Sequence, residues 1–183
     1  MAPRQIMLIR HGEKPSLDGS VLGVTVAGQA SPDELSVRGW QRAGALARFF
    51  APLDEVARPG ILKPEFLFAQ GAAQHVSSVR APHTLSPLAE LLGLPISTAF
   101  AKGQEEQLAA ALGALTGPVL VAWEHRALCL LANFLTGNDR QTPQAWPDDC
   151  FDMVWVFHPA DNGWIFDQVP QLLLPGDRTE AIV

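Results

Sequence analysis

The residues best suited to chemistry in this sequence are Arg10, His11 and Gly12, which end a short apolar run over residues 6–9. Such a run predicts a buried strand that brings a guanidinium and an imidazole to its carboxyl end, where open α/β sheets place their sites. A neutral imidazole can attack phosphorus, a guanidinium can bind phosphate oxygens bidentately, and a glycine lets the backbone pass close to a ligand. The pattern favours phosphoryl transfer, although a structural histidine beside a surface arginine would give the same three letters.

Two later stretches add residues of the same kind. The apolar run 118–123 ends in Glu124, His125 and Arg126, which predicts a second histidine at the carboxyl end of a second strand. Arg80 precedes leucines at helical spacing, so we expect it at or near a helix N-terminus, where free backbone N–H groups also favour an anion. Arg126 either enlarges this positive site or faces water.

The elements that must position these side chains alternate between strand and helix signals. Ser36 is suited to cap a helix that ends before Pro52, and Gly93 and Gly137 are suited to end two later helices. Further predicted strands cover 66–69 and 95–100, a helix covers 104–115, and a hairpin joins 153–157 to 164–169. This order predicts an α/β fold, a three-layer α/β/α sandwich with a mostly parallel central sheet.

Composition narrows the class of protein. The 183 residues suit a single domain over 1–183, and 13 basic against 19 acidic residues give a net charge of −6, with no basic stripe for nucleic acid. Four residues before the first strand leave no room for a secretory signal, and no apolar stretch approaches the ~20 residues of a membrane span. Cys129 and Cys150 lack a C-x-x-C spacing, so we expect two unpaired thiols and a cytoplasmic protein.

Residues 13–33 carry turn chemistry without sustained periodicity and predict a long loop beside the first candidate site. Long loops in compact domains are often functional, so this loop is a candidate lid or specificity element. A merely solvated excursion fits the same residues equally well.

Arg10-His11-Gly12, Arg80-Ala81 with Thr84, and the strand-final His125, in this order on an alternating chain, resemble the histidine phosphatase superfamily, the phosphoglycerate-mutase-like proteins. The resemblance implies that His11 becomes phosphorylated and that Arg10, Arg80 and His125 hold the phosphoryl group. Gly12, Glu13, Glu124 and Arg126 are the flanking candidates for substrate binding. The sequence departs from the family at His83, where glutamine is usual, and on both sides of His125. No metal or other cofactor is required by this chemistry.

The proton donor and the substrate stay open at this point. Carboxylates that could protonate a leaving oxygen are Glu13, Glu124, Glu105, Glu106 and Asp149. A phosphorylated small molecule and a phosphoprotein both fit as partners. We expect a phosphatase acting on a small phosphomonoester, with a protein phosphohistidine phosphatase or a catalytically silent phosphate-binding relative as alternatives, and a phosphomutase less favoured because 183 residues offer little covering structure. The sequence gives no signal for an oligomeric state.

Overall fold

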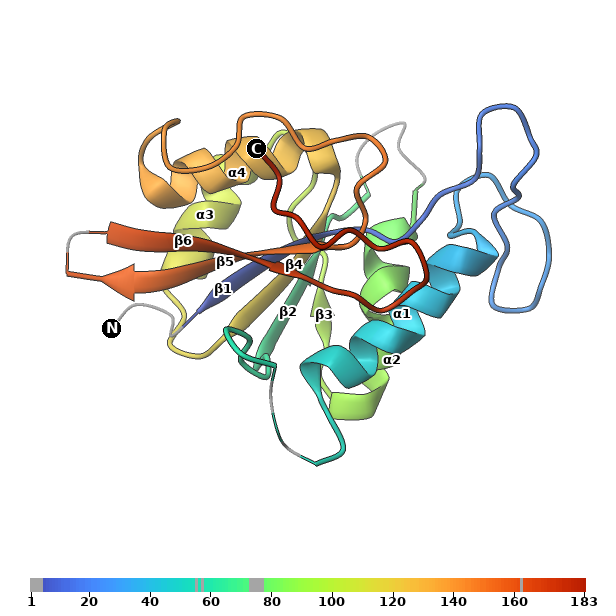
Figure 1. Cartoon of the computed structure of the whole chain (residues 1–183), viewed down its shortest axis with the longest axis horizontal. Coiled ribbons are helices and arrows are strands. Elements are labelled where there is room, and N and C mark those ends of the chain that lie inside the picture. The colour runs from blue at the N-terminus through green and yellow to red at the C-terminus, as the bar shows by residue number, and fades with distance from the viewer. Residues whose placement is uncertain (1–4, 55, 57, 73–77, 162) are drawn as a thin grey trace.

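A six-stranded mixed sheet forms the centre of the computed structural model, which describes residues 5–54, 56, 58–72, 78–161 and 163–183 (Figure 1). The strands are β1 (Ile6–Arg10), β2 (Phe66–Ala69), β3 (Ile96–Ser97), β4 (Val119–Trp123), β5 (Met153–Ala160) and β6 (Gly163–Pro170). They lie in the order β3-β2-β4-β1-β5-β6. The strands β3, β2, β4 and β1 run parallel to one another, β5 is antiparallel to β1, and β6 is antiparallel to β5. This arrangement confirms the mostly parallel sheet.

Helices cover both faces of the sheet. They are α1 (Val37–Phe50), α2 (Arg80–Leu92), α3 (Glu105–Gly113) and α4 (His125–Thr136). The pair α1 and α2 packs on one face and the pair α3 and α4 on the other, as Figure 1 shows. The predicted three-layer α/β/α sandwich is confirmed.

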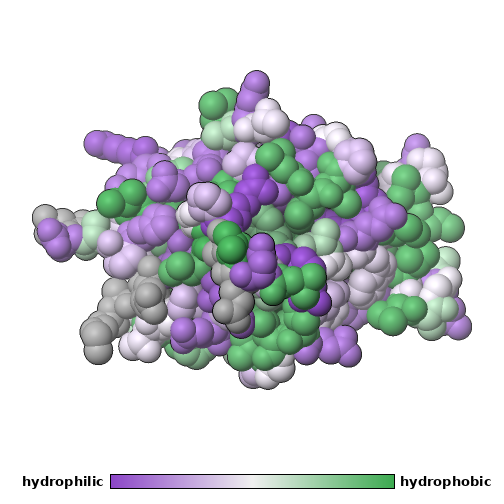
Figure 2. All heavy atoms as spheres, turned by 60° about the horizontal axis from the view of Figure 1, so that its bottom comes forward, coloured by the Kyte–Doolittle hydropathy of each residue, from purple (hydrophilic) through white to green (hydrophobic). Residues whose placement is uncertain are grey.

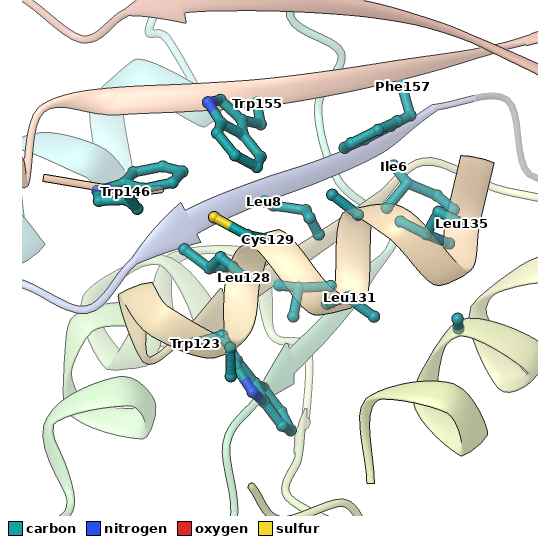
Figure 3. Close-up of a cluster of buried hydrophobic side chains, with 14 of the residues drawn as sticks. Ile6, Leu8, Trp123, Leu128, Cys129, Leu131, Leu135, Trp146, Trp155 and Phe157 are labelled. Atoms are coloured by element: carbon teal, nitrogen blue, oxygen red, sulfur yellow. The ribbon is translucent and has the colours of Figure 1, made fainter. Parts of the chain in front are cut away.

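The alternation of side chains along β1 divides the core in two. Ile6 and Leu8 belong to the cluster beneath α3 and α4, together with Trp123 and Trp155 (Figure 3). Met7 and Ile9 belong to the cluster beneath α1 and α2. Successive strand residues point to opposite faces, so a strand covered on both sides must be apolar throughout. That requirement explains why the run before Arg10 has no polar residue.

Several local signals act as the sequence predicts. The Ser36 hydroxyl accepts a hydrogen bond from the Gly39 amide at 3.1 Å and caps α1, while Gly93 and Gly137 end α2 and α4 in the left-handed conformation. The hairpin of β5 and β6 is present, with Asn162 of its turn outside the described residues. Cys129 and Cys150 are both buried and unpaired.

One predicted strand is shorter than expected. β3 covers only Ile96–Ser97 of the range 95–100, because the chain beyond it turns to pair with Gly71. The Gly71 amide donates to the Phe100 carbonyl at 2.7 Å, and a Cβ atom at position 71 would lie 2.3 Å from the Thr98 carbonyl oxygen. This close approach needs glycine and brings residues 101–103 to the carboxyl edge of the sheet.

The segment 13–33 is an irregular loop that precedes α1 and extends past the N-terminal end of this helix (Figure 1). Its Leu17 and Val26 are almost wholly exposed, and Figure 2 shows hydrophobic atoms at this end of the molecule. None of the described helices combines the length and the apolar character needed to cross a bilayer.

Candidate active site

The carboxyl ends of β1 and β4 meet at one edge of the sheet, because these strands are parallel neighbours with Arg10 paired to Trp123. The His11 amide donates to the Trp123 carbonyl at 3.2 Å and extends this pairing by one residue. The Glu124 side chain accepts from the Ala127 amide at 3.3 Å and caps α4. His125 is therefore the first residue of α4 rather than the last residue of a strand, and it lies at the same edge as His11.

His11 is held as a neutral imidazole with a defined tautomer. Its side chain is 7% exposed, and Nδ1 lies 2.8 Å from the Gly12 carbonyl oxygen. A carbonyl oxygen only accepts, so Nδ1 carries the proton and Nε2 keeps a lone pair. Burial lowers the pKa of His11 to about 3, the Gly12 hydrogen bond opposes this, and the charges of Arg10 and Arg80 lower the pKa further. Nε2 is an unprotonated nucleophile at neutral pH.

Thr84 fixes the turn that follows His11. The Gly12 amide donates to Thr84 Oγ1 at 2.7 Å, and that hydroxyl donates to the Arg80 carbonyl at 2.7 Å. The first turn of α2 and the end of β1 are thus joined through a buried side chain. Gly12 serves backbone packing, because a Cβ atom there would lie 3.0 Å from the Gly39 carbonyl oxygen. The structure thus gives Gly12 a packing role against α1 that the sequence did not indicate.

The Arg10 guanidinium is anchored by the protein through its Nη1 atom. Its Nη1 donates to the carbonyls of Pro147, Asp148 and Cys150 at 3.3, 2.7 and 3.2 Å, and its guanidinium carbon lies 3.8 Å from the centroid of the Phe151 ring. Within the described part of the chain, its buried Nε and Nη2 make no hydrogen bond. Burial lowers the pKa of Arg10 to about 10, so the group stays charged at neutral pH. Two buried cationic N–H groups without an acceptor are suited to an anion.

His125 lies between two carboxylates. Its Nε2 is 2.5 Å from Asp148 Oδ1, and its Nδ1 is 3.2 Å from Glu124 Oε1. Burial and the charge of Arg10 lower the pKa of His125, and these effects outweigh the hydrogen bond to Asp148, which raises it. The Asp148 carboxylate only accepts, so Nε2 carries the proton of the neutral ring.

A cavity of about 180 Å³ opens beside His11 and Arg80. Its wall also includes Gln70, Ser78, Lys102 and Glu124. Arg80 is anchored through Nη2 to the Pro32 carbonyl at 2.7 Å, and it is the first residue of α2, as the sequence predicted. Burial raises the pKa of Glu124, but the hydrogen bond and charge of Lys102, whose Nζ lies 3.1 Å away, lower it below the usual value. The cavity wall combines a nucleophile, two cations and an ionised carboxylate.

The other predicted site residues lie elsewhere. The Glu13 carboxylate binds Arg42 and Arg38 at 2.8 and 3.1 Å and lines a second hollow, together with Asp149 and Arg178. Arg126 is 73% exposed and 4.0 Å from Asp148, and it is not among the described wall residues of the first cavity.

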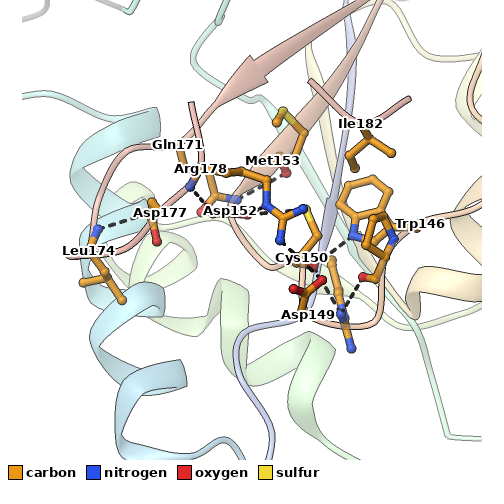
Figure 4. Close-up of polar contacts among 12 residues, drawn as sticks. Trp146, Asp149, Cys150, Asp152, Met153, Gln171, Leu174, Asp177, Arg178 and Ile182 are labelled. Carbon is orange, nitrogen blue, oxygen red and sulfur yellow. Dashed lines mark hydrogen bonds and ion pairs between the residues drawn. The ribbon is translucent and has the colours of Figure 1, made fainter. Parts of the chain in front are cut away.

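The remaining acid candidates have structural partners or another location. Glu105 is buried against Trp123 Nε1 at 3.1 Å, and Glu106 lines a hollow next to α4. Asp149 binds Arg178 at 3.4 Å (Figure 4). Of the five carboxylates named from the sequence, Glu124 is the one that the structure places on the cavity wall.

Three residues at the site were not singled out from the sequence: Gln70, Ser78 and Lys102. The sequence predicts a turn over 146–149, with a place at the rim of the site as the less favoured alternative, and the structure places Asp148 of that turn against His125. Gln70 follows β2 at the same sheet edge, and its position after an apolar run was the available signal. Lys102 and Asp148 belong to turns, whose placement depends on long-range packing. Residues 73–77, which include His75 and part of the turn before Arg80, lie outside the described residues.

Comparisons with known proteins place the fold. No family model matches this sequence, and no curated protein matches it. The protein histidine phosphatase SixA, solved with tungstate, superimposes with a TM-score of 0.54 at 17% identity over 91% of this chain and 97% of that one. A phosphoserine phosphatase from Entamoeba histolytica, solved with phosphoserine, superimposes with a TM-score of 0.55 at 13% identity. The superposition covers 88% of this chain and 94% of that one. Mycobacterial glucosyl-3-phosphoglycerate phosphatase superimposes with a TM-score of 0.52 at 15% identity, over 90% of this chain and 97% of that one.

Proposed function

We propose that this chain, which has the fold of the histidine phosphatase superfamily, is a phosphatase that hydrolyses a phosphomonoester through a phosphohistidine on His11. The observation that carries the proposal is the state of His11, a buried neutral imidazole whose Nδ1–H donates a hydrogen bond to the Gly12 carbonyl and whose Nε2 is free to attack. The ring shares a cavity with Arg80, and the unpaired N–H groups of Arg10 lie within electrostatic reach.

The proposed reaction has two steps. In the first, the Nε2 lone pair of His11 bonds to phosphorus while the bond to the leaving oxygen breaks, and that oxygen takes a proton from solvent water. In the second, a water oxygen bonds to phosphorus and gives a proton to the Glu124 carboxylate, while the P–N bond breaks and its electron pair returns to Nε2. Glu124 then releases that proton to solvent. Arg10, Arg80 and the Nε2–H of His125 stabilise the charge on the other three phosphoryl oxygens.

Hydrolysis is preferred to phosphoryl migration because, within the described part of the chain, the long loop 13–33 does not line the cavity. The loop 13–33 is a neighbour of Arg80 through Pro32, yet none of its residues lines the described cavity. A mutase must keep water from its intermediate while the product reorients. A cavity that this loop does not line favours attack by water.

Glu124 bears on the choice of substrate. Its lowered pKa makes it an ionised carboxylate before substrate binds, suited to accept a proton from water in the second step. The same observation supports protein phosphohistidine as a second candidate substrate, because an imidazole leaves more readily than an alkoxide. The small cavity favours the terminal phosphoryl group of a small phosphomonoester, which stays our first choice.

The test is phosphate release from an aryl phosphate, with trapping of acid-labile phosphate on the protein. We expect turnover by the native chain and its loss in His11→Ala. His158→Ala is the matched control, because His158 lies at the other end of β5 beside Asp167. A chain that binds phosphate but neither turns over nor becomes phosphorylated would be the silent relative. A panel of small phosphomonoesters beside a phosphohistidine-bearing protein then decides the substrate class.

A further inference from the structure

The carboxylate of Asp148 covers the nitrogen of His125 that the proposed reaction needs. Its Oδ1 lies 2.5 Å from His125 Nε2, at the first residue of the twelve-residue helix α4. The two partners differ in accessibility, because the His125 side chain is 7% exposed while the Asp148 side chain is 76% exposed. A buried hydrogen-bond donor is therefore satisfied by a side chain that reaches it from the solvent side.

The backbone of this segment is fixed although the side chain is exposed. Arg10 Nη1 donates hydrogen bonds to the carbonyl oxygens of Pro147, Asp148 and Cys150. The Trp146 indole adds a hydrogen bond to the Cys150 carbonyl at 2.9 Å (Figure 4). Rotation of the Asp148 side chain alone can therefore open His125, with no movement of the backbone.

The surroundings of the Asp148 carboxylate are those of an anion site. The Nε and Nη2 atoms of Arg10 are buried without hydrogen-bond partners among the described residues, and the charge of Arg10 acts on Asp148. The N-terminus of α4 adds the partial positive charge of a helix dipole. Asp148 thus places a negative charge where a phosphoryl oxygen would find the same donor.

We propose that Asp148 determines the affinity of this site, as an internal anion that occupies His125 Nε2 until a phosphoryl group replaces it. The inference rests on the proposed function, because it takes His125 as a ligand of the phosphoryl group. One N–H can serve only one of the two anions, and their like charges repel at close range. Arg126 Nη2, 4.0 Å from Asp148 Oδ2, is placed to hold the displaced carboxylate at the surface.

The test compares Asp148→Asn with the native chain in calorimetric binding of inorganic phosphate and in competitive inhibition of aryl phosphate hydrolysis by phosphate. The variant keeps the shape of the side chain and removes its charge. We expect the dissociation constant for phosphate to fall by about tenfold, which corresponds to about 1.4 kcal/mol. Asp149→Asn is the matched control, since it removes the same charge from the neighbouring residue, which is 85% exposed and bound to Arg178. We expect the control to change the constant by less than about twofold.

Three results would overturn the inference: an unchanged or weaker phosphate affinity in Asp148→Asn, an equal gain in Asp149→Asn, or no phosphate binding by either chain. A loss of kcat with unchanged phosphate affinity would make Asp148 a proton donor instead. Failure of the proposed function looks different. If the native chain releases no phosphate from any ester while Asp148→Asn still binds phosphate more tightly, the phosphatase proposal fails and Asp148 keeps its role.

Discussion

Arg42 binds both carboxylate oxygens of Glu13, with its Nη2 at 2.8 Å from Oε1 and its Nε at 3.0 Å from Oε2. The same guanidinium binds Asp177 Oδ1 at 2.7 Å and is 2% exposed at its side chain. This buried ion pair ties the residue two positions after His11 to α1 and to the C-terminal segment. It also explains why Glu13 does not reach the cavity beside His11.

The Arg42 ion pairs lead to a prediction about stability. Arg42→Met should lower the free energy of unfolding by about 3–5 kcal/mol, because it leaves two carboxylates without their buried partner. Arg38→Met is the matched control, since Arg38 binds the same Glu13 from a position that is 44% exposed, and it should cost no more than about 1 kcal/mol. Urea denaturation measures both. Equal losses in the two variants would contradict a dominant role of the buried pair.

The contact between α1 and the turn after His11 gives a second prediction. A Cβ atom at Gly39 would lie 2.4 Å from the Glu13 carbonyl oxygen, so Gly39→Ala must displace that turn. We expect a loss of stability of about 1–3 kcal/mol, together with a lower rate of aryl phosphate hydrolysis.

Gly44→Ala on the same helix is the control for Gly39→Ala. A Cβ atom there meets nothing within 4 Å, so alanine should stabilise α1 by roughly 0.5–1 kcal/mol and leave the rate unchanged. Thermal unfolding and steady-state kinetics of both variants test the pair. A Gly39→Ala protein with native stability and rate would show that the turn adapts without cost.

The lowered pKa of His11 makes stability depend on pH. The folded chain keeps this imidazole neutral down to a pKa of about 3, whereas the unfolded chain protonates it below about 6.5. The contribution of His11 to the free energy of unfolding is therefore fully present above pH 6.5, and it decreases as the pH drops from 6.5 toward 3. From pH 7 to pH 5, the titration of this one group should lower the free energy of unfolding by about 2 kcal/mol.

His11→Asn provides the reference, because its amide N–H can still donate to the Gly12 carbonyl and it does not titrate. As the pH falls from 7 to 5, the native chain should lose more unfolding free energy than the asparagine variant. Any advantage of the native chain at pH 7 should therefore shrink or reverse at pH 5. Urea denaturation at several pH values measures this difference. A difference that stays constant with pH would contradict a neutral, buried His11.

The order of the elements could be predicted from the sequence because it depends on local physics. Apolar runs bounded by turns marked β1, β2 and β4, and capping residues such as Ser36 and Gly93 marked the ends of helices within one turn. Parallel strands then bring their carboxyl ends to one edge, so His11 and His125 had to lie close together. These local signals were enough to predict the fold class, the placement of Arg80 at a helix N-terminus and the proximity of the two histidines.

The side chains that complete the site were decided by tertiary structure. Glu13 is adjacent to the motif in sequence yet belongs to Arg42, while Asp148 is 23 residues beyond His125 and binds it directly. The carbonyls that orient Arg10 come from residues 137–140 positions away. Spacing along a chain predicts contacts only within a helix or between paired strands. Where a turn is held by packing and by a buried charge, its neighbours are fixed by the fold as a whole.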